Sequence, residues 1–223
     1  MFPAKGEEIW VKKSYNYILL DWDGCLAKTL DIWLGALRKA LEKRQHFFKD
    51  EEIGANFTVF EERMKARGIE DVEAMVKEAD EQATQESKHV ELYQDAIPVL
   101  RKLLSDNKHL ALITTSRHKQ IDPLLAKHHI QDLFDVVVCG DNVQNYKPHP
   151  EPIERALELL HADREDALMV GDSTSDLDSA RNAGVDSVLF YPPEHIKYYS
   201  LEALKRADPT HVIEDFHELN KLV

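Results

Sequence analysis

Short apolar runs recur along the chain, and longer segments of mixed polarity separate them. Each run is apolar at successive positions, as a strand must be when helices cover both faces of its sheet. The expected strands are Tyr17–Leu20, Leu110–Thr114, Val136–Cys139, Ala167–Val170, Ser187–Phe190 and His211–Ile213.

The segments between these strands have the periodicity of helices with one apolar face. One helix follows Ser173 or Ser175, either of which can cap it, and ends before Gly184. The expected helices are Ala96–Ser105, Lys119–His128, Pro152–Leu160, Ser175–Ala183 and a terminal helix after Ile213. This alternation predicts an α/β fold with a doubly wound, Rossmann-like parallel sheet as its core.

Helical patterns interrupt the alternation between the first and second strands. Leu30, Leu34, Leu37 and Leu41 share one helical face with Trp33, which we interpret as part of the packing of this region. An insertion at this point lies beside the carboxyl edge of the sheet. We therefore predict an inserted α-helical cap domain, and the alternative is a helical embellishment without a role.

Two further helices are expected in the insertion, at Phe57–Ala66 and Val72–Ser87, with breaks at Gly54 and Gly68. The predicted domains are then a core of residues 1–28 and 91–223 and a cap of residues 29–90.

The composition is that of an ordinary globular protein, with 43% hydrophobic and 31% charged residues in a chain of 223. The formal net charge is −13, from 41 acidic and 28 basic residues. Nucleic acids and anionic membranes require a basic surface, so neither is an expected partner. An anionic substrate would need local help from a metal ion, a lysine or backbone amides.

Cysteine use and hydropathy indicate a compartment. The two cysteines, Cys25 and Cys139, are expected to be reduced thiols. No apolar stretch approaches the roughly 18 residues of a membrane span. We expect a cytoplasmic protein that is a monomer or a homodimer.

Two carboxylates, Asp21 and Asp23, follow the first strand and precede Gly24. Polar groups at the carboxyl ends of parallel strands are where α/β proteins place their sites. Two such carboxylates repel each other unless a cation or a shared proton holds them. By itself this pair fits a solvated turn as well as a site.

The other strand ends carry complementary groups. Thr114 begins a run of hydroxyls, Lys147 lies in a proline-rich loop, and Asp172 and Asp176 follow the fourth strand. Each has a local alternative as a helix cap or a surface turn. Together they offer hard oxygen ligands for Mg²⁺ and a cation for phosphate. The combination indicates phosphoryl chemistry on an aspartyl nucleophile.

These segments resemble the four motifs of the haloacid dehalogenase superfamily, in the same order. They are Asp21–Leu26, Thr114, Lys147-Pro148 and Gly171–Asp176. The insertion resembles the C1 cap of that family. The run Lys147–Pro152 and the closing segment His211–Leu219 are similar to its phosphoglycolate phosphatase-like branch. Trp22 and Cys25 depart from the usual residues beside the nucleophile.

The resemblance implies a role for each carboxylate. Asp21 is the nucleophile that forms an aspartyl-phosphate, and Asp23 is the general acid and base. Asp21, the backbone carbonyl of Asp23 and Asp172 hold Mg²⁺, while Asp176 anchors Lys147 or a metal-bound water.

The resemblance also implies how the phosphate is bound. Thr114 hydrogen-bonds a phosphoryl oxygen, and Lys147 neutralises both the nucleophile and the phosphate. The backbone amides of Trp22, Thr115 and Ser116 are further donors.

The implied function is a Mg²⁺-dependent phosphatase that hydrolyses a small phosphorylated metabolite. The alternatives are a sugar phosphomutase of the same fold and a non-catalytic phosphate-binding regulatory protein. A dehalogenase needs no proton for its leaving group and lacks a carboxylate at the position of Asp23. The presence of Asp23 therefore argues against hydrolysis of a carbon–chlorine bond.

Recognition of the rest of the substrate has the weakest signal. Polar side chains in or near the cap are candidates for it, although residues of this kind in the cap are more often solvated helix positions. They are Asn56, Arg63, Arg67, Arg117 and His118.

Overall fold

The structure is a computed structural model that describes residues 13–54, 57 and 60–223. Six parallel strands form one sheet in the order β3-β2-β1-β4-β5-β6. This order is that of a doubly wound sheet, in which the order of the strands reverses between β1 and β4. The predicted fold class is therefore confirmed. The strands are β1 Tyr17–Leu20, β2 His109–Ile113, β3 Val136–Val138, β4 Ala167–Gly171, β5 Asp186–Phe190 and β6 His211–Ile213.

Both faces of the sheet are buried. Ile18 and Leu20 of β1 belong to an apolar cluster with α5 and α6, whereas Leu19 belongs to a second cluster with α7 and α8. This alternation of side chains follows from the pleat of the strand. The covering helices are α5 Ala96–Ser105, α6 His118–His128, α7 Glu151–Leu160 and α8 Thr174–Ala183.

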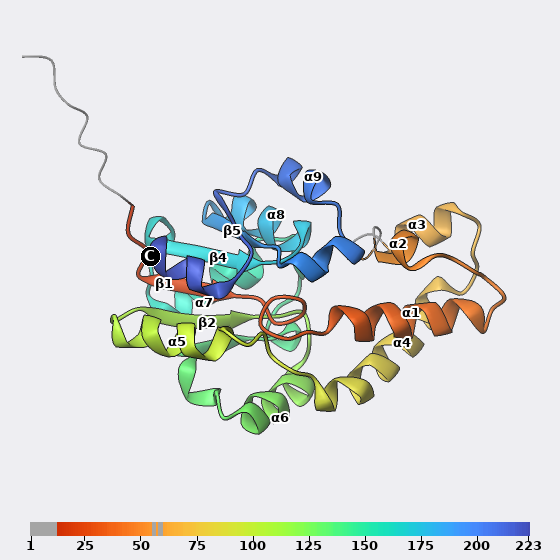
Figure 1. Ribbon diagram of the computed structural model, residues 1–223, viewed down its shortest axis with the longest axis horizontal. Coiled ribbons are helices and arrows are strands. Elements are labelled where there is room, and N and C mark those ends of the chain that lie inside the picture. The colour runs from red at the N-terminus through yellow and green to blue at the C-terminus, as the bar shows by residue number, and fades with distance from the viewer. Residues whose placement is uncertain (1–12, 55–56, 58–59) are drawn as a thin grey trace, which may run out of the picture.

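A group of helices inserted between β1 and α5 extends beyond the carboxyl ends of the strands (Figure 1). Its residues Leu34, Leu41, Met75 and Ala79 form an apolar cluster of their own. Tyr198, which follows β5, joins this cluster and so connects the insertion to the core. The helices are α1 Leu30–Glu42, α2 Asp50–Gly54, α3 Phe60–Ala66 and α4 Val72–Glu86.

The ends of α8 follow the sequence signals. Ser173 is its N-cap and forms a capping box with Asp176, and Gly184 ends the helix at a φ of 71°. Positive φ is a conformation that glycine adopts without strain. Within the described part of the chain, no helix has the length and apolar character needed to cross a membrane.

The structure differs from the expectations in three short segments. The terminal helix is a 3-10 helix, Phe216–Lys221, which Asp215 caps by accepting from the Glu218 amide. A segment this short cannot show a helical period in its sequence. The same limit explains why the sequence did not predict α2, or α9 at Leu201–Leu204.

Candidate active site

Asp21 lies at the centre of the carboxyl edge, directly after β1. Its backbone N–H donates to the Val170 carbonyl at 3.0 Å, which extends the pairing of β1 with β4 by one residue. The chain then closes a tight loop in which the Ala27 N–H donates to the Trp22 carbonyl at 2.9 Å. Gly24 in this loop has a φ of 75°, and a side chain there would collide with the carboxylate of Asp172. The glycine thus lets the loop close against the fourth strand.

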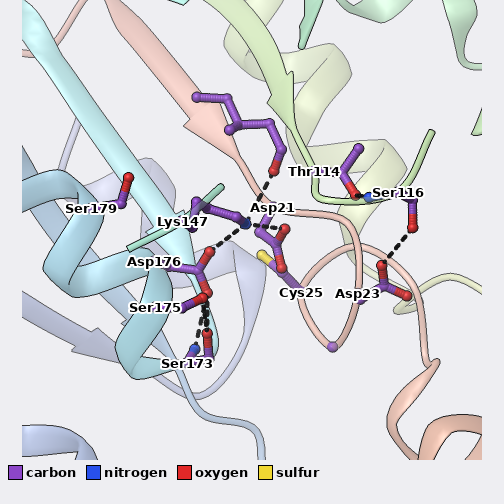
Figure 2. Close-up of polar contacts among 12 residues, drawn as sticks. Asp21, Asp23, Cys25, Thr114, Ser116, Lys147, Ser173, Ser175, Asp176 and Ser179 are labelled. Atoms are coloured by element: carbon purple, nitrogen blue, oxygen red, sulfur yellow. Dashed lines mark hydrogen bonds and ion pairs between the residues drawn. The ribbon is translucent and has the colours of Figure 1, made fainter. Parts of the chain in front are cut away.

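Lys147 connects two of the predicted carboxylates (Figure 2). Its ammonium donates to Asp21 Oδ1 at 2.5 Å, to Asp176 Oδ1 at 2.6 Å and to the Ile113 carbonyl at 3.3 Å. The Lys147 side chain is only 4% exposed. Lys147 follows β3, and its three partners lie at or after the ends of β1, β2 and β4, so groups from four strand ends meet here, as the sequence predicted for this edge.

Helix α8 holds the loop that carries Lys147. Ser179 donates to the His149 carbonyl at 2.8 Å, and Asn182 donates to the Pro148 carbonyl at 2.9 Å. Glu151 accepts from the Gln144 amide at 2.7 Å, which fastens the other side of the loop. The lysine therefore approaches Asp21 from a rigid support, which limits the entropy lost on binding an anion.

The electrostatics of this cluster are dominated by burial. Burial and the nearby Asp176 raise the pKa of Asp21 to about 8, against the opposing pull of Lys147. Burial, with Asp176 and Asp21, raises the pKa of Asp172 well above its usual range. Burial alone would lower the pKa of Lys147, but Asp176 and Asp21 outweigh it and raise that pKa. The site therefore has more carboxylates than its lysine can balance.

The carboxylates suit a divalent cation. Ligand atoms of Asp21, Asp172 and Asp176 all lie within 4.8 Å of one another. Oδ2 of Asp172 is buried and has no hydrogen-bond partner among the described residues. A buried carboxylate oxygen is costly unless a cation or a donor satisfies it. Because these ligands are all oxygens and partly bound to Lys147, the cluster fits Mg²⁺, which takes few carboxylates and keeps several waters.

Asp23 lies beside this cluster and is held by one donor from each side. The Trp33 indole Nε1–H donates to Oδ1 at 3.2 Å, and the Ser116 hydroxyl donates to Oδ2 at 3.3 Å. Burial raises the pKa of Asp23 against the effect of these donors. The contact with Trp33 is a finding that the sequence missed, since we had expected this residue to serve packing.

The hydroxyl residues after β2 have two kinds of surroundings: some hydrogen-bond to neighbouring residues, and one lines the cavity. Thr114 is buried, and its Oγ1 accepts from the Ser116 amide at 3.1 Å. Thr115 lines the cavity above Asp21. Trp22 is buried and lines a smaller cavity of about 100 Å³ behind Asp23. The roles of Trp22, Thr114, Thr115 and Ser116 toward a phosphate stay predictions.

Cys25 and Cys139 are free and buried. The Cys25 thiol contacts the Val170 carbonyl at 3.6 Å, and burial raises its pKa well above the usual range. A buried thiol of this kind is inert, so Cys25 serves packing behind Asp21.

A cavity of about 560 Å³ opens above the carboxylates. Its floor holds Asp21, Asp23, Lys147 and Asp172, together with Thr115, Ser173 and Ser175. The remaining lining residues come from the inserted helices and from the segment after β5, and they are Leu30, Trp33, Leu37, Phe57, Phe60, Glu61, Glu62, Val76 and Tyr199.

Four of the recognition candidates named from the sequence, Arg63, Arg67, Arg117 and His118, are not among the described residues that line this cavity. Arg67 pairs with Glu52 at 3.8 Å, and Arg63 is exposed on α3. Arg117 precedes α6, and His118 binds Asp122 and Asn142 instead. Asn56 lies outside the described residues. Exposed polar positions on short helices have no periodicity that tells which ones face a cavity.

Known proteins resemble the chain along most of its length. The family model described as haloacid dehalogenase-like hydrolase matches residues 18–190. Pyrophosphatase PpaX of Halalkalibacterium halodurans is 28% identical over 93% of this chain and 96% of its own length.

Solved structures agree. A haloacid dehalogenase-like hydrolase candidate from Bacteroides fragilis superposes with a TM-score of 0.80 at 25% identity, covering 92% of this chain and all of its own. A phosphoglycolate phosphatase candidate from Lactobacillus plantarum does so with a TM-score of 0.77 at 21% identity, covering 94% of this chain and all of its own. The resemblance stated from the motifs is confirmed, and with it the prediction of an enzyme of the hydrolase class.

Proposed function

The chain belongs to the haloacid dehalogenase-like hydrolases, and we propose that it is a Mg²⁺-dependent phosphatase that hydrolyses a small phosphate monoester through an aspartyl-phosphate. One observation carries this proposal. Lys147 bridges Asp21 and Asp176 on the floor of a cavity, beside a buried Asp172 oxygen without a hydrogen-bond partner among the described residues. A nucleophile, a cation for phosphate and an oxygen-rich metal position thus meet at one point.

The first half of the reaction transfers the phosphoryl group to the protein. A carboxylate oxygen of Asp21 forms a bond to phosphorus, and the bond from phosphorus to the ester oxygen breaks. Asp23, in its protonated form, gives its proton to that leaving oxygen. The products of this half are a free alcohol and an acyl phosphate on Asp21.

The second half releases phosphate by hydrolysis. A water molecule attacks the phosphorus, and Asp23, now a carboxylate, takes the proton from that water. The bond between phosphorus and the Asp21 oxygen breaks, which restores Asp21 as a carboxylate. Asp23 is again protonated, so the two halves together consume one water and return the protein to its initial state.

Asp21, Asp172 and the backbone carbonyl of Asp23 would hold the Mg²⁺, which when bound offsets the charge that develops on the phosphoryl oxygens. In this assignment, Asp176 keeps Lys147 oriented rather than serving as a direct ligand. The distance of 2.6 Å between Lys147 and Asp176 supports that division.

Lys147 prepares the nucleophile for an anionic substrate. The ammonium donates to Asp21 Oδ1 and favours the ionised form of this carboxyl group, which opposes the burial that raises its pKa. It also supplies a positive charge next to the incoming phosphate, which would otherwise be repelled by Asp21. The burial of this pair strengthens both effects, because water screens the charges little.

Asp21→Asn tests the proposal because it retains the shape of the nucleophile and removes its charge. We expect release of inorganic phosphate from p-nitrophenyl phosphate with Mg²⁺ to fall at least about a thousandfold. A phosphoenzyme trapped from the wild type should be absent from the variant. Asp132→Asn, an exposed position far from the cavity, is the matched control. Turnover by Asp21→Asn close to that of Asp132→Asn would refute the aspartyl-phosphate.

A further inference from the structure

The cavity above Asp21 changes its chemistry from the floor to the mouth. Its floor carries the acidic cluster and Lys147. Its walls are apolar and aromatic, and include Leu30, Trp33 and Val76. Two carboxylates of α3, Glu61 and Glu62, line it as well, and both residues are exposed. A substrate that places its phosphate on the floor therefore points its other end toward apolar groups and negative charge.

Positive charge for a second anionic group is missing from the described lining. Lys147 is the only basic residue among the described residues of the lining, and it is committed to Asp21 and Asp176. Arg67 and Lys65, two basic residues of the cap, make other contacts, whereas Arg63 of α3 is exposed and is not among the described lining residues. Arg67 lies over the ring of Phe48 at 5.0 Å, and Lys65 donates to Glu73 at 2.7 Å. Lys65 also forms an exposed ion pair with Glu61 at 3.7 Å, so the charge of Glu62 is the less compensated of the two.

The walls provide aromatic surfaces close to one another. Phe57 contacts Tyr199 edge-on, with ring centroids 6.1 Å apart, and Tyr199 lies on the core side of the cavity. Trp33 supplies a third ring from α1. Aromatic faces attract cationic groups, most strongly alkylated ammonium groups that lose little hydration. Carboxylates beside such rings add a direct electrostatic attraction for the same group.

The size of the cavity points in the same direction. A volume of about 560 Å³ lies within the range of sites that enclose organic ligands. A compact inorganic anion would leave much of the apolar wall in contact with water. An organic leaving group would bury that wall and gain hydrophobic free energy in proportion to the area covered.

We propose that the substrate is a phosphate monoester of an amino alcohol, whose leaving group has an alkyl body and a cationic ammonium end between the aromatic walls and Glu61 and Glu62. This inference rests on the proposed phosphatase function. It also means that esters or anhydrides with a second anionic group are poor substrates, because that group would meet two carboxylates and an apolar wall.

A substrate series that varies the charge of the far end tests the proposal. Phosphocholine, n-butyl phosphate, phosphoglycolate and inorganic pyrophosphate would be compared with the wild type and Mg²⁺, by kcat/KM for phosphate release. We expect phosphocholine to exceed n-butyl phosphate by roughly tenfold, and the two anionic compounds to fall below n-butyl phosphate. A higher kcat/KM for phosphoglycolate or pyrophosphate than for phosphocholine would overturn the inference.

Charge reversal at the mouth supplies the second test. The double variant Glu61→Lys, Glu62→Lys should lose about tenfold in kcat/KM for phosphocholine and gain on phosphoglycolate, with n-butyl phosphate little changed. Glu81→Lys, an exposed residue of α4 outside the lining, is the matched control. Equal responses of the double variant and the control would overturn the assignment of Glu61 and Glu62.

The two levels of the proposal fail in different ways. If the wild type hydrolyses none of these esters and not p-nitrophenyl phosphate either, both the phosphatase function and the substrate class are refuted. If it hydrolyses p-nitrophenyl phosphate but has a higher kcat/KM for phosphoglycolate or pyrophosphate than for phosphocholine, only the substrate class is refuted.

Discussion

The carboxyl edge of the sheet and the helical cap use charge in opposite ways. At the sheet edge, the side chains of Lys147, Asp21 and Asp176 are 4%, 8% and 1% exposed. In the cap, Lys43 pairs with Glu78 while their side chains are 67% and 36% exposed. Buried charges interact strongly and tolerate no missing partner, whereas exposed pairs contribute about 1 kcal/mol or less.

The difference shows where each region obtains its stability. The cap is held by apolar packing between α1 and α4, around residues such as Leu34 and Met75, and its charges can change at little cost. The sheet edge holds its charges in one buried arrangement, in which Lys147 contacts both Asp21 and Asp176. Under the proposed function, the core would therefore supply the chemistry, and the cap could vary the part of the cavity that meets the leaving group.

Replacing Lys147 by Met should produce the largest effect and would sharpen this comparison most. The variant leaves Asp21 and Asp176 buried without their cation, so we expect a loss of about 3 kcal/mol in the free energy of unfolding. Phosphate release should fall at least about a thousandfold. Lys43→Met is the matched change in the cap and should cost less than about 1 kcal/mol by urea unfolding. Similar losses in the two variants would contradict the contrast between the regions.

Removal of the metal should have the next largest effect. EDTA should abolish phosphate release and MgCl₂ should restore it. At a Mg²⁺ concentration about a hundred times the Kd, the wild type should gain about 2.7 kcal/mol in unfolding free energy. Asp172→Asn keeps the shape of the side chain but not its charge, and should lose this gain in a thermal melt. An unchanged Mg²⁺ response in Asp172→Asn would place the metal elsewhere.

His195 joins the two regions and should make stability depend on pH. It is fully buried, its Nε2 shares a hydrogen bond with the Tyr93 hydroxyl at 2.7 Å, and its ring contacts Tyr198 and Tyr199. Burial lowers its pKa from 6.5 to about 4. The unfolded chain therefore binds the proton first as pH falls, so folding loses stability below the unfolded pKa.

The size of this effect follows from the two pKa values. Lowering the pH from about 7 to about 5 should cost about 2 kcal/mol through His195. Urea unfolding of the wild type and of His195→Phe across this range isolates the contribution, because other groups titrate in both proteins. A parallel pH dependence in the two proteins would assign no role to His195.

Trp33→Phe should have the smallest effect, and it tests the hydrogen bond from the Trp33 indole of α1 to Asp23, the predicted acid. The phenyl ring retains the wall of the cavity but cannot donate to Asp23. We expect kcat to fall roughly tenfold with little change in KM, since a hydrogen bond to a charged group is worth about 1.5 kcal/mol or more. Phe57→Leu, a wall residue without such a contact, should change KM instead. A change in KM alone for Trp33→Phe would show that Trp33 lines the cavity without affecting Asp23.

The sequence predicted the core well because its signals are local. Six apolar runs became the six strands, and the polar residues after four of them met at one edge, as parallel strands require. The sequence predicted a helix after β6, and the structure has a 3-10 helix there. A segment of six residues has too little periodicity for the sequence to distinguish a 3-10 helix from an α-helix. The sequence predicted helices in the cap, but it did not indicate which face of each helix lines the cavity.

What the sequence by itself determined was that Asp21, Lys147 and Asp172 meet at one edge of the sheet. Strand ends in a parallel sheet come together whatever the loops between them do, so identity and order suffice to predict the cluster. Only the tertiary structure decided the cavity above it. Trp33 reaches Asp23, and Tyr199 lines the same cavity as Glu61 and Glu62, because of how the cap packs on the core. That packing depends on side-chain contacts between segments far apart in the chain, and no local pattern records it.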